Sequence, residues 1–333
     1  MRAVAARSYG PLRPVGRVGT IGEVDRPGRH GHQSPPGVAR GFRRDCRIPS
    51  PHPDPEPVRS VPRAAGSVTS VTRLQIVGGG NMGEALLGGI LDARWADPSE
   101  IVVVERLADR CGELRALFPG VAVTDTVVAS EGAVIAVKPG DVPDTCRALA
   151  AAGVTRVLSI AAGVTLATLQ DACGPDVAVV RAMPNTPAVV RAGAAAIAAG
   201  ASATEVDLDW ASSILDAVGV VVRVPEDKLD AVTGLSGSGP AYVFLMAESM
   251  IEAGVLVGLP REVAEVLAVQ TLLGSAQLLE SSDQHAAALR AQVTSPGGTT
   301  AAGLRALESG GFRASVLDAI AAATERSREL GRG

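Results

Sequence analysis

The sequence predicts an α/β protein in which a parallel-sheet domain is followed by an all-helical domain. Three observations lead to this prediction. A short apolar strand runs through a glycine-rich turn into an amphipathic helix at residues 74–91, apolar strands then alternate with helical stretches, and strand patterns disappear near residue 225. Alternating strands and helices typically form a parallel sheet covered on both faces. We therefore divide the chain into residues 1–72, 73–225 and 226–333.

Residues 1–72 differ in composition from the rest of the chain. They hold 11 of the 22 prolines and 12 arginines but no lysine, with five acidic residues, which gives a net charge of +7. The segment has no sustained apolar periodicity, so we expect a disordered Arg/Pro-rich extension that is dispensable for the fold. Four alternatives remain open: an organellar transit peptide, a nucleic-acid-binding arm, translation from an upstream start codon, and a tail without function.

The stretch RLQIVGGGNMGEALLGGILDA, which begins at Arg73, predicts a dinucleotide site. Its G-x-G-x-x-G motif follows a strand and opens a helix, which is the Rossmann-like context. Gly78 would make the tight turn, Gly80 would let the backbone approach a pyrophosphate, and Gly83 would allow close helix–strand packing. The helix N-terminus at Asn81 and Met82 would favour the anion.

The next strand, EIVVVER, ends at the two residues expected to choose the cofactor. Glu105 would accept the 2′-hydroxyl of NAD, and Arg106 would pair with the 2′-phosphate of NADP. The two conflict, so we expect a modest preference for NADPH with NAD still possible. Arg106, and Arg110 one turn later, could instead be a solvated helix start.

The alternation continues along the chain. Further strands are expected at 132–139, 156–164, 177–185, 192–200 and 220–224, and helices at about 106–118, 141–151 and 165–172. Ligands of such sheets lie at the carboxyl ends of the strands. The residues at those ends are Lys138, Pro139, Ala161, Ala162, Met183 and Asn185.

Two glycine-rich stretches interrupt the helical second half. In GLSGSGPAYVF, Ser236 and Ser238 precede Pro240, which is expected to open a long helix. In QVTSPGGTTAAGLRAL, Ser295 is expected to cap a helix whose first residue is Pro296, although the following glycines disfavour a helix. Each stretch alone could be a helix junction where glycine permits close packing, but together they indicate anion binding at helix N-termini.

Composition narrows the chemistry. Residues 73–333 carry a net charge of −11, which argues against nucleic acid as the main partner, and no apolar run reaches the ~20 residues of a membrane span. The four cysteines have no metal-ligand spacing and resemble reduced thiols of a cytoplasmic protein, so no metal is expected. His285, the only histidine of this part, is expected at a helix start. Hydride transfer fits such a site, because the cofactor carries the chemistry.

Six motifs together resemble the pyrroline-5-carboxylate reductase family. They occur in the family's order: VGGGNMGEALLGGI, AVKP, SIAAGVT, RAMPNTPA, GLSGSGPAYVF and VTSPGGTTAAGL. The resemblance covers residues 73–333 and implies reduction of 1-pyrroline-5-carboxylate to L-proline with NAD(P)H, the last step of proline biosynthesis. It also implies that the helical domain binds substrate and forms a homodimer, that dimers assemble into a decamer, and that two chains contribute to each active site.

The resemblance also implies site residues. For the cofactor they are the 78–83 turn, Ala136, Val137, Lys138, Pro139, Ala161 and Ala162. For the substrate they are Asp283, Ser295, Gly297, Gly298, Thr299 and Thr300, to which we add Ser236 and Ser238. We expect the Thr300 hydroxyl to reach the ring nitrogen and to act in catalysis.

Two other functions are alternatives to this reductase activity. A β-hydroxyacid dehydrogenase has a similar layout but needs a catalytic lysine on a helix of the second half, where the only lysine is Lys228, in the connection PEDKLD. A non-catalytic NAD(P)-binding regulator would bind the cofactor without turnover.

Overall fold

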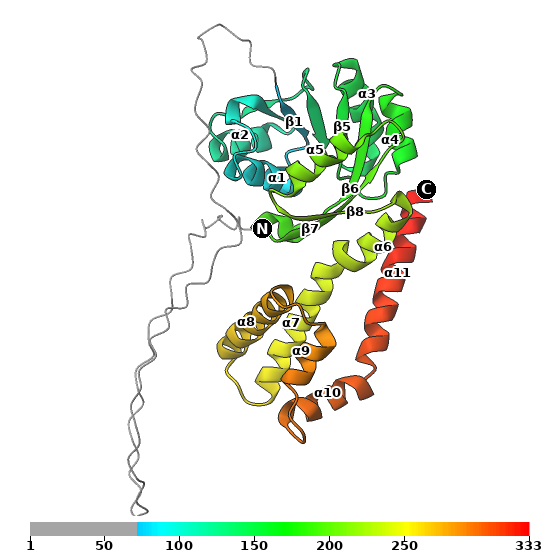
Figure 1. Cartoon of the computed structure of the whole chain (residues 1–333). Helices are drawn as coiled ribbons and strands as arrows, with labels where there is room; N and C mark the ends of the chain where they lie inside the picture. Colours follow the sequence, from blue (N-terminus) through cyan, green and yellow to red (C-terminus); the bar gives the residue numbers. More distant parts are fainter. Residues whose placement is uncertain (1–71, 333) are drawn as a thin grey trace, which may run out of the picture. The chain divides into compact units, whose positions relative to one another are not determined.

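The computed structural model describes residues 72–332, so the predicted N-terminal extension lies outside the described residues except for Thr72. The first part is built on one eight-stranded sheet with the order β3-β2-β1-β4-β5-β6-β7-β8 (Figure 1). Its strands are β1 (Leu74–Val77), β2 (Ile101–Val104), β3 (Ala122–Thr124), β4 (Gly132–Ile135), β5 (Arg156–Ser159), β6 (Ala178–Met183), β7 (Gly193–Ala199) and β8 (Gly219–Arg223).

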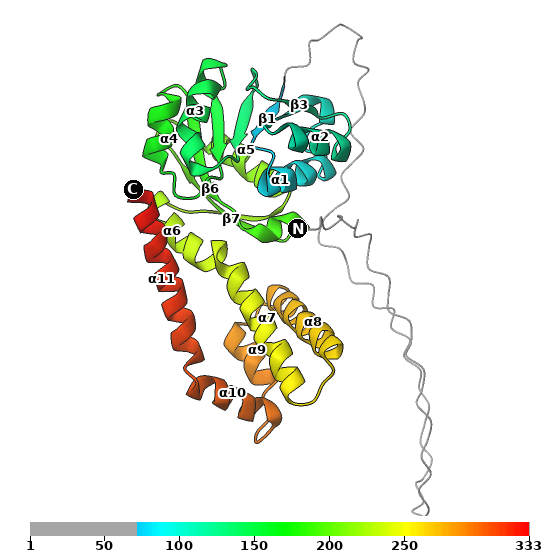
Figure 2. The same cartoon turned by 180° about the vertical axis from the view of Figure 1, so that it is seen from behind.

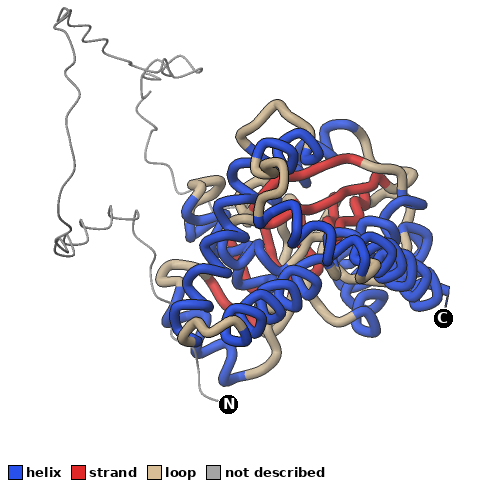
Figure 3. The backbone as a smooth tube through the Cα atoms, turned by 90° about the horizontal axis from the view of Figure 1, so that it is seen from below, coloured by secondary structure: helices blue, strands red, loops and turns tan. Residues whose placement is uncertain are grey.

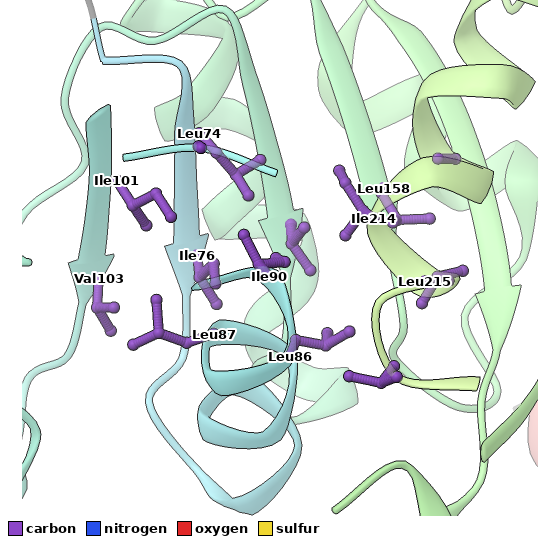
Figure 4. Close-up of a cluster of buried hydrophobic side chains, with 14 of the residues drawn as sticks. Leu74, Ile76, Leu86, Leu87, Ile90, Ile101, Val103, Leu158, Ile214 and Leu215 are labelled. Carbon is purple, nitrogen blue, oxygen red and sulfur yellow. The ribbon is translucent and has the colours of Figure 1, made fainter. Parts of the chain in front are cut away.

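Helices cover both faces of this sheet, as predicted. They are α1 (Asn81–Asp92), α2 (Ala108–Leu117), α3 (Val142–Ala151), α4 (Leu166–Cys173) and α5 (Glu205–Leu215), with α3 and α4 seen best from behind (Figure 2). Figure 4 shows Leu86 and Ile90 of α1 and Ile214 of α5 facing apolar residues of the strands. Side chains of α3 and α4 form a second core cluster with the alternate strand residues. Burial on both faces explains why β1, β2 and β4 are buried along their whole length.

One strand pair departs from the predicted parallel sheet. The β6–β7 pair is antiparallel, whereas β7 pairs with β8 in parallel. Only a 3-10 turn, η3 (Thr186–Val190), joins β6 to β7, and a parallel pair needs a crossover of a dozen or more residues. Two elements were also missed: the short strand β3, and helix α5, whose start carries a capping box between Thr204 and Asp207.

After β8 the described chain is helical. It contains η4 (Glu226–Lys228), α6 (Leu229–Val232), a π-helical turn η5 (Thr233–Gly237), α7 (Gly239–Leu256), α8 (Arg261–Glu280), α9 (Ala286–Gln292), α10 (Thr299–Ser309) and α11 (Phe312–Arg332). Figure 3 traces these helices in blue and the strands in red. No described helix is long and apolar enough to cross a lipid bilayer.

The helical region leaves much apolar surface uncovered. Helix α7 has no buried residue, and α8 buries only Ala264 and Ala268. Large apolar side chains on both helices are exposed, for example Phe244 at 67% and Val266 at 69%. Surfaces of this kind usually mark a protein–protein contact.

Candidate active site

The glycine-rich turn after β1 has a geometry that only glycine provides at two of its positions. Gly78 has φ +108°, and a Cβ there would lie 2.5 Å from the Ala136 carbonyl oxygen. A Cβ on Gly83 would lie 2.0 Å from the Gly78 carbonyl oxygen, so α1 packs directly onto the turn. At Gly80, by contrast, nothing lies within 4 Å of an added Cβ. The turn is therefore tight at its ends and open in its middle, where a ligand could approach the backbone.

The open middle of the turn coincides with the start of α1. Gly80 is the N-cap residue, and no side chain caps this helix. The first N–H groups of a helix have no partner inside it and carry a partial positive charge. The groups at Asn81, Met82 and Gly83 can therefore bind an anion such as a pyrophosphate.

The backbone of Gly79 is held through both its N–H and its carbonyl group. Its N–H donates to Glu105 Oε2 at 3.0 Å, and its carbonyl oxygen accepts from Arg110 Nε at 2.7 Å. Arg110 also pairs with Glu84 and Glu113. Burial lowers the pKa of the Arg110 guanidinium, but the hydrogen bonds to Glu84 and Glu113 outweigh it and raise that pKa. Arg110 is thus not part of a solvated helix start: it fixes the turn.

A cavity of about 660 Å³ lies beside this turn, at the carboxyl ends of β1, β2 and β4. It brings together seven of the predicted cofactor residues: Gly78, Gly80, Glu105, Arg106, Ala136, Val137 and Lys138. The other six, Asn81, Met82, Gly83, Pro139, Ala161 and Ala162, do not line it.

Part of the cavity wall was not predicted. Asp125, Thr126 and Val127 belong to the loop after β3, and Asp141 and Thr145 lie at the start of α3. The loop residues were missed because β3 was not recognised, although a segment that follows a parallel strand should reach this edge of the sheet. Arg106 also faces the cavity, and its guanidinium lies 3.5 Å from Asp141 Oδ1 while remaining 72% exposed.

The stretch containing Ser236 and Ser238 leads into the long helix α7 with Pro240 in its first turn, as predicted. It is not a free helix N-terminus, so that part of the prediction is wrong. Helix α6 continues through the π-helical turn η5 into α7, and the Ser238 N–H already donates to the Thr233 carbonyl oxygen at 2.8 Å. Pro240 has no N–H to offer the Ser236 carbonyl, which instead accepts from Asn185 Nδ2 at 3.1 Å. Asn185, at the end of β6, thereby ties the sheet to the π-helical turn.

The stretch from Ser295 to Thr300 forms a turn before it forms a helix. Helix α10 begins at Thr299 with Gly298 as N-cap, so the predicted start with Ser295 as cap and Pro296 as first residue is wrong. The Gly298 N–H donates to the Ser295 carbonyl at 3.1 Å, and Gly297 has φ +67°. Proline followed by a glycine with positive φ is the signature of a type II turn, which ends the helical path here. No side chain caps α10, so its first N–H groups are available to an anion.

Within residues 72–332, no hydrogen bond or ion pair joins the turn 295–300 to the cavity residues. Asp283 lies in the exposed connection between α8 and α9, Ser295 and Thr299 are exposed, and Thr300 is half-buried. In the part of the chain that the structure describes, no hydrogen bond or ion pair therefore joins these substrate residues to the predicted cofactor residues.

The remaining candidate groups play no visible part in the site. Lys228 lies in η4 and pairs with its neighbour Asp227, which does not fit a catalytic lysine on a helix. His285 is the N-cap of α9, at a helix start as predicted. Cys111, Cys146 and Cys173 are free and buried, and Cys46 lies outside the described residues. Across the described part of the chain, no group of three or more His, Cys, Asp or Glu residues could hold a metal ion.

Comparison with protein families gives two matches. Residues 226–330 match the family described as pyrroline-5-carboxylate reductase dimerisation. Residues 73–163 match the family described as NADP oxidoreductase coenzyme F420-dependent. The first of these matches begins just after the end of β8, and residues 164–225 lie in neither match.

Similar proteins cover almost the whole of residues 73–333. A pyrroline-5-carboxylate reductase of Synechocystis is 47% identical over 265 residues, which are 78% of this chain and 98% of that protein. The pyrroline-5-carboxylate reductase of Mycobacterium tuberculosis is 46% identical over 288 residues, and the match covers 78% of this chain and 97% of that protein.

Solved structures agree. The pyrroline-5-carboxylate reductase of Coxiella burnetii is 37% identical, with a TM-score of 0.74 over 78% of this chain and 98% of that one. The Plasmodium falciparum pyrroline carboxylate reductase with NADP bound is 29% identical, with a TM-score of 0.68 over 79% of this chain and 99% of that one. With this fold, this uncapped helix start and these relatives, the chain belongs to the pyrroline-5-carboxylate reductase family.

Proposed function

We propose that the protein reduces 1-pyrroline-5-carboxylate to L-proline with NADPH in the cytoplasm, as the last step of proline biosynthesis. The observation that carries this proposal is the uncapped N-terminus of α1 beside the 660 Å³ cavity, in a chain of this family. Residues 73–225 would bind the cofactor, and residues 226–333 would bind the substrate and form the dimer.

The cavity fits a nicotinamide dinucleotide. The turn 78–83 would hold the pyrophosphate, because its middle is open and no side chain caps the N–H groups of Asn81, Met82 and Gly83. Ala136, Val137 and Lys138 would line the path of the cofactor along the strand ends, with Pro139, Ala161 and Ala162 further along that edge. Bound NADPH would supply the hydride.

The substrate carboxylate would bind at the start of α10. The N–H groups there are free, and Gly298 keeps the approach to them clear. The hydroxyls of Ser295 and Thr299 lie close by in the sequence and would add donors, as Thr300 would at the ring nitrogen. Asp283 would lie at the edge of the same site.

A second copy of the chain would complete the active site. This follows from two observations: the turn 295–300 makes no hydrogen bond or ion pair with the cavity residues within the described chain, and the exposed apolar faces of α7 and α8 lie inside the segment matching the dimerisation family. We propose a homodimer that assembles further into a decamer.

An assay of NADPH oxidation with 1-pyrroline-5-carboxylate tests the function directly. We expect turnover that depends on both compounds and yields L-proline. Cofactor binding without turnover would instead identify a regulator. Reduction of NADP⁺ by a β-hydroxyacid, with no turnover of 1-pyrroline-5-carboxylate, would identify the other dehydrogenase class.

Replacing Arg106 by alanine is expected to raise KM for NADPH about tenfold and to leave KM for NADH nearly unchanged. The exposed guanidinium would lose its charge-assisted hydrogen bonds to the 2′-phosphate, which NADH lacks. Arg326→Ala, which removes an exposed arginine of α11, is the matched control and should change neither value. Equal losses with both cofactors would show that Arg106 acts structurally.

Gly298→Ala is expected to raise KM for 1-pyrroline-5-carboxylate while NADPH binding stays intact. An added Cβ would lie 2.3 Å from Ser295 Oγ and would crowd the N–H groups at the start of α10. Gly303→Ala, further along the same helix, has open space around its Cβ and serves as the control. If Gly298→Ala binds substrate as the wild type does, the glycine serves the turn and not the ligand.

A further inference from the structure

The acidic residue at the end of β2 has a different set of partners from the one expected of a ribose ligand. In sheets of this kind, a carboxylate at that position normally accepts the 2′-hydroxyl of NAD. Here both oxygens of Glu105 are engaged by backbone. Oε2 accepts from the Gly79 N–H at 3.0 Å, and Oε1 accepts from the N–H groups of Arg106 at 2.8 Å and Leu107 at 3.0 Å.

These three bonds use most of the acceptor capacity of the side chain. A carboxylate offers about four lone-pair positions, two on each oxygen. Because two of these positions are occupied on Oε1 and one on Oε2, Glu105 cannot accept hydrogen bonds from the two hydroxyls of a ribose with both of its oxygens. Its negative charge also faces three N–H dipoles, which reduces its repulsion of a nearby phosphate.

The same bonds hold the cofactor turn in shape. Glu105 accepts from the Gly79 N–H, which belongs to the peptide group between Gly78 and Gly79. Arg110 donates at 2.7 Å to the Gly79 carbonyl oxygen, which belongs to the peptide group between Gly79 and Gly80. The orientation of these two adjacent peptide groups sets the position of Gly80, the N-cap of α1. The open approach at Gly80 and the free N–H groups of α1 therefore depend on this pair of side chains.

The side chain of Arg106, in contrast to that of Glu105, is not bonded to the turn. Its backbone N–H binds Glu105, but its guanidinium is 72% exposed, faces the cavity and has one contact, 3.5 Å from Asp141. A phosphate could take the place of that exposed contact at little cost, because ion pairs between exposed groups contribute little.

We infer that Glu105 is a positioning residue which, with Arg110, fixes the backbone on both sides of Gly79 for either cofactor, and that the choice between NADPH and NADH is made by Arg106. This inference rests on the proposed function, since it concerns the same cofactor site. It replaces the expectation that Glu105 opposes the 2′-phosphate.

Cofactor binding by the full-length chain tests this inference without substrate. Dissociation constants for NADPH and NADH are measured by isothermal titration calorimetry for the wild type, Glu105→Gln and Arg110→Met. We expect each variant to weaken the binding of both cofactors by the same factor, about tenfold. The reason is that each variant loses a hydrogen bond to a charged group that orders the turn. The ratio of the two dissociation constants should stay within about twofold of the wild-type ratio, because the contact that distinguishes NADPH from NADH is made by Arg106.

Two further readouts separate positioning from a general loss of structure. At saturating NADPH, kcat of Glu105→Gln should stay within about twofold of the wild type, since the reacting groups are unchanged. The double variant should lose less than the sum of the two single losses, because the two side chains hold adjacent peptide groups of the same turn. Where Glu105→Gln does not fold, Arg110→Met carries the test.

Three results would overturn the inference. They are a loss of NADH binding alone in Glu105→Gln, a gain in NADPH binding by that variant, and no change with either cofactor. If the wild type binds neither cofactor, the proposed function itself fails, and this outcome is visible before any variant is made.

Discussion

Thr300→Ala is expected to lower kcat by roughly 10–1,000-fold, which corresponds to about 1.4–4 kcal/mol of activation free energy. Thr300 lies in the first turn of α10, half-buried, two residues after the N-cap Gly298. From there its hydroxyl would donate a hydrogen bond to the ring nitrogen of the substrate. Electron density grows on that nitrogen as the C=N bond is reduced, so the bond strengthens in the transition state and affects kcat more than KM.

The neighbouring threonine provides the control for this experiment. Thr299 is exposed and precedes Thr300 in the same turn, so Thr299→Ala removes an equivalent hydroxyl from the helix start. We expect it to change KM for 1-pyrroline-5-carboxylate with kcat close to that of the wild type. Thr300→Ser should keep most of the activity, because it retains the hydroxyl. Full kcat in Thr300→Ala would mean that its hydroxyl only contacts the helix start.

Gly80→Ala is expected to weaken NADPH binding at least tenfold without changing the fold. Gly80 has φ −68°, which alanine adopts readily, and no atom lies within 4 Å of its added Cβ. The methyl group would therefore meet only the bound pyrophosphate. The melting temperature should fall by only about 2–4 °C, because alanine at an N-cap costs about 1 kcal/mol relative to glycine.

Gly83→Ala separates ligand approach from packing. Its Cβ would lie 2.0 Å from the Gly78 carbonyl oxygen, so the turn or α1 must shift. We expect a loss of NADPH affinity together with a fall of roughly 5 °C in melting temperature, since overpacking at a backbone contact is destabilising. Normal NADPH affinity in Gly80→Ala would place the pyrophosphate elsewhere.

The geometry of the cofactor turn could be predicted from the sequence because it depends on local backbone requirements. Gly78 needs a positive φ, Gly83 needs close contact and Gly80 needs open space, and each requirement is carried by the spacing of the motif itself. The positions of Glu105 and Arg106 at the end of β2 were also predictable. The hydrogen bonds of Glu105 were not, because they depend on how the side chain turns once the strand and the glycine turn lie side by side.

The turn 295–300 illustrates a conflict between two local signals. Ser295 followed by Pro296 resembles a helix start, but Pro296 followed by Gly297 also favours a type II turn, and the positive φ of Gly297 decides for the turn. The π-helical turn at Thr233–Gly237 could not be predicted from the sequence for another reason. The Ser236 carbonyl left free by Pro240 finds its partner in Asn185, about fifty residues away in the sequence.

The unburied face of α7 has a consequence for how the stability of this protein must be measured. A helix with no buried residue in one copy of the chain gains little free energy from folding alone. If a second copy covers it, folding and association are one equilibrium, and the free energy of unfolding then depends on protomer concentration. We expect the melting temperature to rise when the protein is concentrated and to fall on dilution. We also expect dilution to abolish enzyme activity, although the residues of the cofactor cavity stay the same.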